Sequence, residues 1–139
     1  MFSKILHAND GSDPAFRALA LAIAIAKQNN SELHTVSVEE IDYMPEFIEE
    51  IREETGTASR RFHGVLQRAR AMAEESQVTI HTHVVAGHAV RDIIKLAADL
   101  GVELLVIGAS GHSQIYEHML GTRAARIVHL ARCPVLVAR

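Results

Sequence analysis

Five short apolar segments that alternate with helical segments limit what this chain can fold into. The apolar segments span residues 5–8, 33–38, 78–85, 104–107 and 134–137, and the helical segments span residues 16–26, 46–76, 87–100 and 122–132. Near-continuous apolar strands are typical of parallel sheets, because helices cover both faces of such a sheet. The order βαβαβαβαβ therefore predicts an α/β fold with a five-stranded parallel sheet and helices on both faces.

Residues that favour helix caps mark two of the helix ends. Ser12 or Asp13 is expected to cap the first helix, with Pro14 in its first turn. Gly101 fits the position that follows the helix over residues 87–100. The apolar side chains expected to face the core from the first and last helices are Leu19, Leu21, Ile23, Ile25, Ala124, Ile127, Val128 and Ala131.

Composition restricts the class of protein. A length of 139 residues fits one domain over residues 1–139, and contents of 48% hydrophobic and 22% charged residues are typical of a soluble globular protein. The net charge of −3 argues against a broad nucleic-acid surface. No apolar run is long enough to cross a bilayer, and the first residues lack the apolar stretch of a secretory signal. With Cys133 as the single cysteine, we expect a cytoplasmic protein without membrane insertion.

Polar or glycine-containing turns follow three of the apolar segments. They are Asn9-Asp10-Gly11, the residues after Val38, and residues 108–111. Ligands of open parallel sheets bind beyond the carboxyl ends of the strands, where the strand order reverses. We therefore expect the three turns to line one crevice.

The most specific motif is Gly-x2-Gly-x9-Gly-Thr, formed by Gly108, Gly111, Gly121 and Thr122. Glycines let the main chain approach a ligand closely, and the free N–H groups of a following helix attract anions. The Walker A pattern and the dinucleotide fingerprint Gly-x-Gly-x-x-Gly are both absent from the chain, as is the Gly-x-Ser-x-Gly elbow of hydrolases. The motif thus predicts a phosphate-binding loop of a different type.

This glycine motif, together with Asp10-Gly11-Ser12 after the first strand and the terminal Cys-Pro-Val-Leu-Val, resembles the universal stress protein family. The resemblance extends over the whole chain in the order of elements, and the glycine motif is that of the nucleotide-binding branch. It implies a Rossmann-like, doubly wound fold and a homodimer in which the last strand, Val135–Ala138, pairs with its mate. An apolar edge strand left bare is an association hazard, so such pairing is physically reasonable.

The resemblance also implies a bound nucleotide, ATP or AMP, accompanied by Mg²⁺ or Mn²⁺. Asp10 is expected near the adenosine and the metal ion, and Val38 near the adenine. Gly108 and Gly111 are expected around the ribose and phosphates, and Gly121 and Thr122 at the phosphates. The full set of expected nucleotide-binding residues is Ala8, Asp10, Val38, Ile107, Gly108, Ser110, Gly111, Gly121, Thr122, Arg123 and Ala124.

Two arginines depart from the family pattern just after the motif. Arg123 and Arg126 lie near a helix N-terminus, where the helix dipole disfavours cations. A bound anion would relieve this conflict, whereas solvated arginines on an amphipathic helix are the alternative explanation.

We expect an adenine-nucleotide-binding protein of stress response or signalling that acts as a switch through a dimer, with an unknown protein partner. No residue set is suited to rapid phosphoryl transfer, so we assign no catalytic residue. One alternative is a slow ATPase or nucleotidyl-transfer enzyme, which could use Asp10, Ser110, His112 and Thr122. Another is a dimeric interaction protein with a vestigial pocket.

Several histidines stay open to two interpretations. His81 and His83 alternate onto one strand face and could form half of a metal site, but no third ligand is visible and a structural or surface role is favoured. His112 and His118 lie inside the glycine motif, where solvent exposure is favoured over phosphate contact. His7 is expected to be a core or crevice residue.

The charged segment over residues 46–70 is interpreted as a solvated helical face rather than as a flap or partner surface.

Overall fold

A single five-stranded parallel sheet forms the centre of the molecule. The computed structural model describes residues 1–41, 60–110 and 120–139. The strands are β1 (Lys4–Ala8), β2 (Glu32–Glu40), β3 (Ile80–Gly87), β4 (Leu104–Gly108) and β5 (Val135–Ala138), in the spatial order β3-β2-β1-β4-β5. All four pairings are parallel. The predicted fold class is confirmed, and the strand order reverses between β1 and β4.

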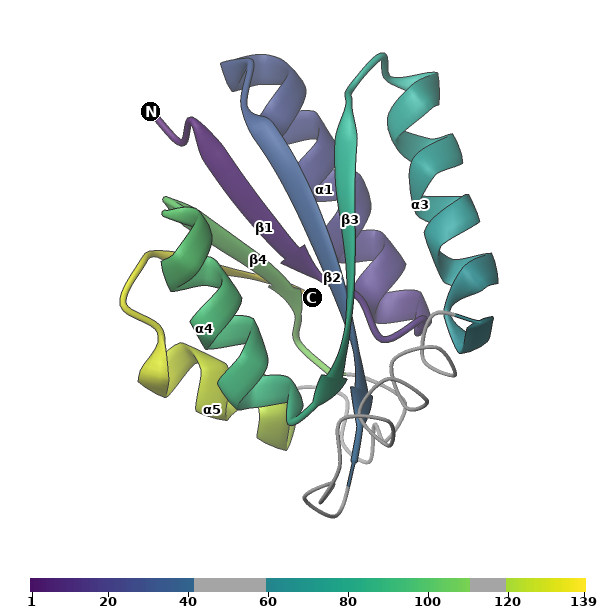
Figure 1. The fold of residues 1–139 in the computed structure, drawn as a ribbon. Helices are drawn as coiled ribbons and strands as arrows, with labels where there is room; N and C mark the ends of the chain where they lie inside the picture. Colours follow the sequence, from purple (N-terminus) through teal and green to yellow (C-terminus); the bar gives the residue numbers. More distant parts are fainter. Residues whose placement is uncertain (42–59, 111–119) are drawn as a thin grey trace.

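Helices cover both faces of this sheet. They are α1 (Asp13–Asn29), α3 (His63–Glu75), α4 (Ala89–Leu100) and α5 (Thr122–Leu130). Figure 1 shows α1 and α3 on one side of the sheet and α4 and α5 on the other. No helix in the described part of the chain is long and apolar enough to cross a membrane.

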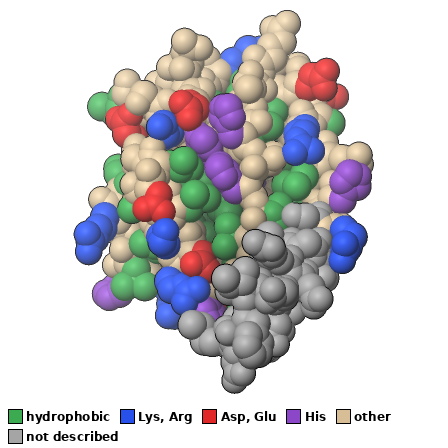
Figure 2. Space-filling view, viewed as in Figure 1, with side chains coloured by type: hydrophobic (Ala, Val, Ile, Leu, Met, Phe, Trp, Pro, Cys, Tyr) green, Lys and Arg blue, Asp and Glu red, His purple; other side chains and the backbone are tan. Residues whose placement is uncertain are grey.

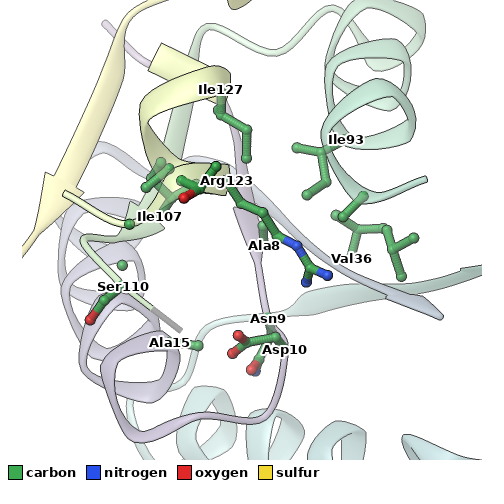
Figure 3. Close-up of a pocket in the computed structure, with 16 residues that line it drawn as sticks. Ala8, Asn9, Asp10, Ala15, Val36, Ile93, Ile107, Ser110, Arg123 and Ile127 are labelled. Carbon is green, nitrogen blue, oxygen red and sulfur yellow. The ribbon is translucent and has the colours of Figure 1, made fainter. Parts of the chain in front are cut away.

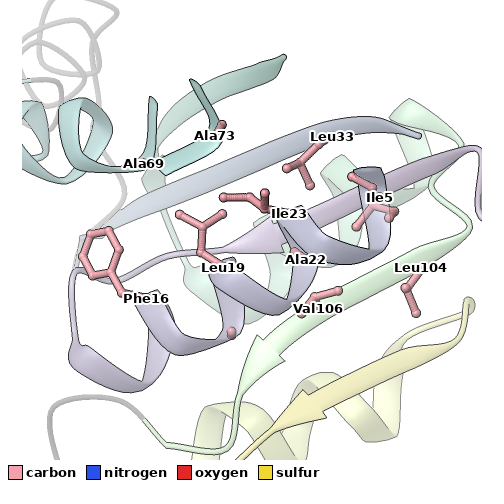
Figure 4. Close-up of a cluster of buried hydrophobic side chains, with 12 residues drawn as sticks. Ile5, Phe16, Leu19, Ala22, Ile23, Leu33, Ala69, Ala73, Leu104 and Val106 are labelled. Carbon is pink, nitrogen blue, oxygen red and sulfur yellow. The ribbon is translucent and has the colours of Figure 1, made fainter. Parts of the chain in front are cut away.

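Each face carries its own hydrophobic core. On the α1 and α3 face, side chains of α1 pack on the central strands, as Figure 4 shows for Leu19 and Ile23 beside Leu33 and Val106. On the other face, Leu6 and Leu105 pack against α4 and α5. Adjacent residues of β1, such as Ile5 and Leu6, belong to opposite cores, as the two-residue period of a strand requires. Their complete burial holds β1 at the centre of the fold.

The predicted caps are present at both helix ends. Ser12 caps α1, because its side chain accepts the backbone N–H of Ala15 at 3.3 Å. Gly101 ends α4 in the left-handed conformation with φ of 70°, which glycine adopts without steric cost.

Several element boundaries differ from the prediction. β2 continues through polar residues to Glu40, and β3 starts at Ile80 and continues to Gly87. β2 and β3 stay paired up to Glu40 and Gly87. Their backbone hydrogen bonds therefore continue both strands past the apolar residues on which the prediction was based. As a consequence α4 begins at Ala89. α5 ends at Leu130, and β5 lies one residue later than expected.

Two apolar side chains predicted to be buried face solvent. Leu21 is 40% exposed and Val128 is 44% exposed. Leu21 is two residues from the buried Leu19 and Ile23, a rotation of about 200° around a helix, so it lies on the opposite side. Val128 follows the buried Ile127 and is rotated away from the sheet in the same manner. Residues 46–59 of the predicted charged helix lie outside the described residues.

Candidate functional site

A crevice of about 500 Å³ lies at the carboxyl ends of β1, β2 and β4. This is the position at which parallel sheets with a reversed strand order bind ligands. Figure 3 shows its lining side chains, which come from strands, from turns and from the first two turns of α1, α4 and α5. The residues that line the crevice are Ala8, Asn9, Asp10, Ala15, Val36, Val38, Ala89, Ile93, Ile107, Gly108, Ser110, Gly121, Thr122, Arg123, Ala124 and Ile127.

The turn after β1 forms a rigid polar corner of the crevice. Asp10 Oδ1 accepts the backbone N–H of Ser12 at 3.0 Å and its hydroxyl at 2.5 Å. Asn9 Oδ1 accepts the backbone N–H of Gly11 at 2.9 Å, and Gly11 has a φ of 85° that favours glycine. These bonds fix both side chains before any ligand arrives.

The amide nitrogen of Asn9 is a buried donor at this corner. The residue is 3% exposed, and Nδ2 has no hydrogen-bond partner among the described residues. An unpaired buried polar atom costs roughly 1–3 kcal/mol and calls for an explanation, of which a ligand group is one. A ligand acceptor at this corner is one partner that would satisfy the donor.

Gly108 brings the end of β4 against the start of α1. A Cβ at this position would lie 3.1 Å from the backbone carbon and oxygen of Pro14. Such contacts are tighter than ordinary side-chain packing, so the close approach of the two backbones requires glycine here.

The N-terminus of α5 points its backbone N–H groups toward the crevice side of the sheet. Gly121 is the N-cap residue, and its own N–H bonds to Ala109 O at 2.7 Å. The first bond within the helix runs from Ala125 N to Gly121 O, so the N–H groups of Thr122, Arg123 and Ala124 precede the helical ladder. No described side chain caps this end. Such helix ends favour anions.

One cation among the lining residues sits beside these N–H groups. Arg123 Nη2 lies 3.4 Å from Glu40 Oε1, and the same oxygen accepts the backbone N–H of Ala89 at 2.9 Å. Figure 3 shows the Arg123 side chain extending from α5 toward the side where Val36 and Ile93 lie. The ion pair links α5 to the end of β2 across the mouth of the crevice.

Much of the remaining lining of the crevice is apolar. It is formed by Val36 and Val38 of β2, Ile93 of α4, Ile107 of β4 and Ile127 of α5. One apolar wall and one wall of backbone donors suit a ligand with a flat hydrophobic part and an anionic part.

The structure brings together ten of the eleven residues that the sequence singled out, and the eleventh, Gly111, lies outside the described residues, as do His112 and His118. Their roles toward a nucleotide stay predictions. Asn9 belongs to a turn that was expected to line the crevice, although it was not among the eleven. The sequence interpretation missed five lining residues: Ala15, Val36, Ala89, Ile93 and Ile127. Val36 could have been found, because it shares the face of Val38 two residues away.

Comparison with known proteins was made on the whole chain. The family model of the universal stress protein family matches residues 1–139. The universal stress protein YxiE of Bacillus subtilis (strain 168) is 36% identical, and the match covers 100% of both chains.

Solved structures agree with this match. Universal stress protein UspA from Lactobacillus plantarum superposes with a TM-score of 0.83 at 25% identity, covering 99% of this chain and 98% of that one. A universal stress protein in complex with cAMP superposes with a TM-score of 0.78 at 23% identity, covering 99% of this chain and 97% of that one.

Proposed function

Because the chain belongs to the universal stress protein family, we propose that its crevice binds ATP or AMP and that the protein acts as a nucleotide-dependent switch in a stress or signalling response. The observation that carries this proposal is the pairing of an apolar wall with the donor-rich N-terminus of α5 in one crevice. The related structure in complex with cAMP supports an adenine nucleotide as the ligand.

The geometry suggests how the nucleotide lies. The adenine packs against Val38 and its apolar neighbours, and the ribose lies over Gly108, where no side chain intervenes. The phosphates meet the first-turn N–H groups of α5 and the hydroxyl of Thr122. Each hydrogen bond to a charged oxygen contributes about 1.5–3 kcal/mol, so a few such bonds support tight retention.

Asp10 is the residue that we assign to a divalent ion carried with the nucleotide. Carboxylate oxygens suit Mg²⁺ and Mn²⁺, and the bonds from Ser12 hold the Asp10 side chain at the crevice. Asp10 would hold the ion, which would supply positive charge against the negative phosphates. Among the described residues that line the crevice, Arg123 is the only one with a basic side chain, which fits nucleotide retention better than rapid hydrolysis.

We assign the dimer contact to β5, the edge strand beside β4. Its four residues are all half-buried, and Leu130 at the end of α5 is 48% exposed. Pairing with a second copy would cover this apolar edge.

We assign the protein to the cytoplasm. Its sequence has a single cysteine, which fits a reducing compartment.

Direct measurement of bound nucleotide tests the function. Purified protein is denatured and the released small molecules are identified by mass spectrometry. Nucleotide-free protein is then tested for thermal shifts with ATP, AMP, cAMP and GTP. We expect an adenine nucleotide and a rise in Tm with ATP that grows with ligand concentration. Asn9→Asp should reduce the shift, because it replaces the buried amide donor with an acceptor.

Two outcomes would overturn the proposal. One is the absence of nucleotide in the purified protein together with no thermal shift. The other is multiple turnover of ATP that is lost on Asp10→Ala, which would establish the enzyme alternative instead.

A further inference from the structure

Three histidines and a glutamate gather on the α4 and α5 face of the sheet, outside the crevice. Glu32 and His34 lie two residues apart on β2, and His81 and His83 lie two residues apart on β3. The parallel register pairs His34 with His81, so all four side chains project from the same face. Figure 2 shows histidine side chains side by side over β2 and β3, with an acidic side chain next to them.

His34 is the centre of this cluster. Its Nε2 lies 2.6 Å from Glu32 Oε1, and its Nδ1 lies 2.9 Å from His83 Nε2. Its ring stacks on the His81 ring at a centroid distance of 4.8 Å and on the His83 ring at 5.1 Å. His34 is 5% exposed, whereas Glu32 and His81 are exposed. The cluster is therefore anchored at its base and open to solvent.

We propose that Glu32, His34 and His81 form a binding site for a divalent transition-metal ion of the Zn²⁺ type. One potential ligand atom from each of the three lies within 4.8 Å of the others. Ligand atoms at 2.0–2.2 Å from a tetrahedral Zn²⁺ are roughly 3.4 Å apart, so small movements of the exposed Glu32 and His81 side chains suffice. Three protein ligands leave the fourth position to water.

The donor set selects the class of ion. Two imidazoles and one carboxylate suit Zn²⁺ and its transition-metal neighbours. Mg²⁺ and Ca²⁺ favour oxygen ligands, so they are expected to bind at this site poorly. This contrasts with the crevice, where Asp10 supplies a carboxylate.

His83 serves as a positioning residue for His34. When the metal takes Nε2 of His34, the ring proton resides on Nδ1 and is donated to Nε2 of His83, 2.9 Å away. Metal-bound histidines generally donate their other ring N–H in this way, which fixes the ring and its tautomer.

The site is separate from the nucleotide crevice. Val36 lines the crevice, and it follows the proposed ligand His34 by two residues, or about 7 Å, on the same face of β2, so the site lies beside the crevice without sharing a lining residue. One competing cation is present, since Lys4 Nζ lies 4.0 Å from Glu32 Oε1 on the neighbouring strand. Removal of that charge by Lys4→Met should strengthen metal binding.

Calorimetric titration of tag-free, nucleotide-free protein with ZnCl2 tests the proposal. We expect Zn²⁺ binding that MgCl2 does not compete away. His81→Ala and Glu32→Gln should each abolish one equivalent of binding or weaken it at least tenfold, and both change exposed side chains, so the fold is retained. His83→Phe should weaken binding roughly 10- to 100-fold. His129→Ala, which removes an exposed histidine on α5, should leave it unchanged.

A spectroscopic measurement separates ligation from nonspecific binding. Co²⁺ substituted for Zn²⁺ should give the visible absorption of a four-coordinate site in the wild type and lose it in His81→Ala. Ring ¹⁵N shifts of His34 and His81 should change on Zn²⁺ addition. Equal binding by the wild type and His81→Ala, or no binding of Zn²⁺ at millimolar concentration, would overturn the proposal.

Discussion

The imidazole of His7 in β1 donates its Nε2–H to the backbone carbonyl oxygen of Ala15 in α1, over a distance of 2.8 Å. Its Nδ1 then accepts the hydroxyl of Thr35 at 2.9 Å. His7 is completely buried, and this burial lowers its pKa to about 4, against smaller opposing effects of the Ala15 bond and of Asp10. The ring is therefore neutral in the folded protein and joins the centre of the sheet to the helix that borders the crevice.

The pKa of His7 predicts a loss of stability in mild acid. Below about pH 6.5 the unfolded chain binds a proton at this residue, whereas the folded chain does so only near pH 4. The contribution of neutral His7 is thus fully present above pH 6.5 and is lost as the pH falls toward 4, by about 3 kcal/mol in total. Urea unfolding from pH 4 to 8 measures this.

His7→Gln is the matched variant for this measurement. Its side-chain amide can still donate to Ala15, but it does not titrate. The difference in unfolding free energy between the wild type and the variant should shrink as the pH falls below 6.5, which isolates His7 from the other histidines. A difference that does not vary with pH contradicts the assignment.

Gly108→Val should lower both stability and nucleotide affinity. The new side chain would meet the Pro14 backbone at 3.1 Å, and such overpacking costs about 1–3 kcal/mol. Gly64→Ala is the contrasting change, because nothing lies within 4 Å of a Cβ there and Gly64 is inside α3. It should stabilise the protein by about 0.5–1 kcal/mol. Thermal unfolding measures both, and unchanged stability of Gly108→Val would contradict the close-approach argument.

Arg123→Ala should weaken ATP binding more than adenosine binding. A charged hydrogen bond to phosphate contributes about 1.5–3 kcal/mol, equivalent to roughly 10- to 100-fold in Kd. The stability of the free protein should change little, because Arg123 and its partner Glu40 are substantially solvated. Arg126→Ala is the control, since Arg126 is exposed on the same helix and does not line the crevice. Equal losses for ATP and adenosine would place Arg123 away from the phosphates.

Val137→Pro should convert the proposed dimer to a monomer while leaving the sheet intact. The carbonyls of Pro134 and Ala138 accept hydrogen bonds from β4, so by strand alternation the N–H of Val137 faces the open edge. Proline removes only that outward donor, whereas Leu136→Pro would remove an inward one. Sedimentation equilibrium distinguishes the two states. A dimer that survives Val137→Pro with unchanged affinity would assign the contact to another surface.

The layered fold could be predicted because each apolar segment and each helix cap depends on residues that are close together in the sequence. The predicted five strands and the Ser12 cap are confirmed, since each depends on neighbouring residues. Leu21 and Val128 were wrongly assigned to the core, because hydrophobicity alone does not state which side of a helix meets the sheet.

The cluster of Glu32, His34, His81 and His83 could not be predicted from the sequence, because it depends on contacts between residues that are far apart in the chain. His81 and His83 were visible as a pair, but His34 is remote from them along the chain and is brought beside them only by the β2–β3 register. Register depends on all the pairings of two strands together, so no single segment encodes it. The same holds for Ile93, which reaches the crevice through the packing of α4 on the sheet.

The central place of β1 has a consequence for the order of folding during synthesis. β1 is made before the other four strands of this sheet, yet its partner β4 is completed only about a hundred residues later. At about 5–20 residues per second, the nascent chain spends several seconds with that edge of β1 without its native neighbour. The crevice needs both strands, so a growing chain could bind the proposed nucleotide only after β4 has paired with β1. Ligand binding would then occur only in chains that have completed the central part of the sheet.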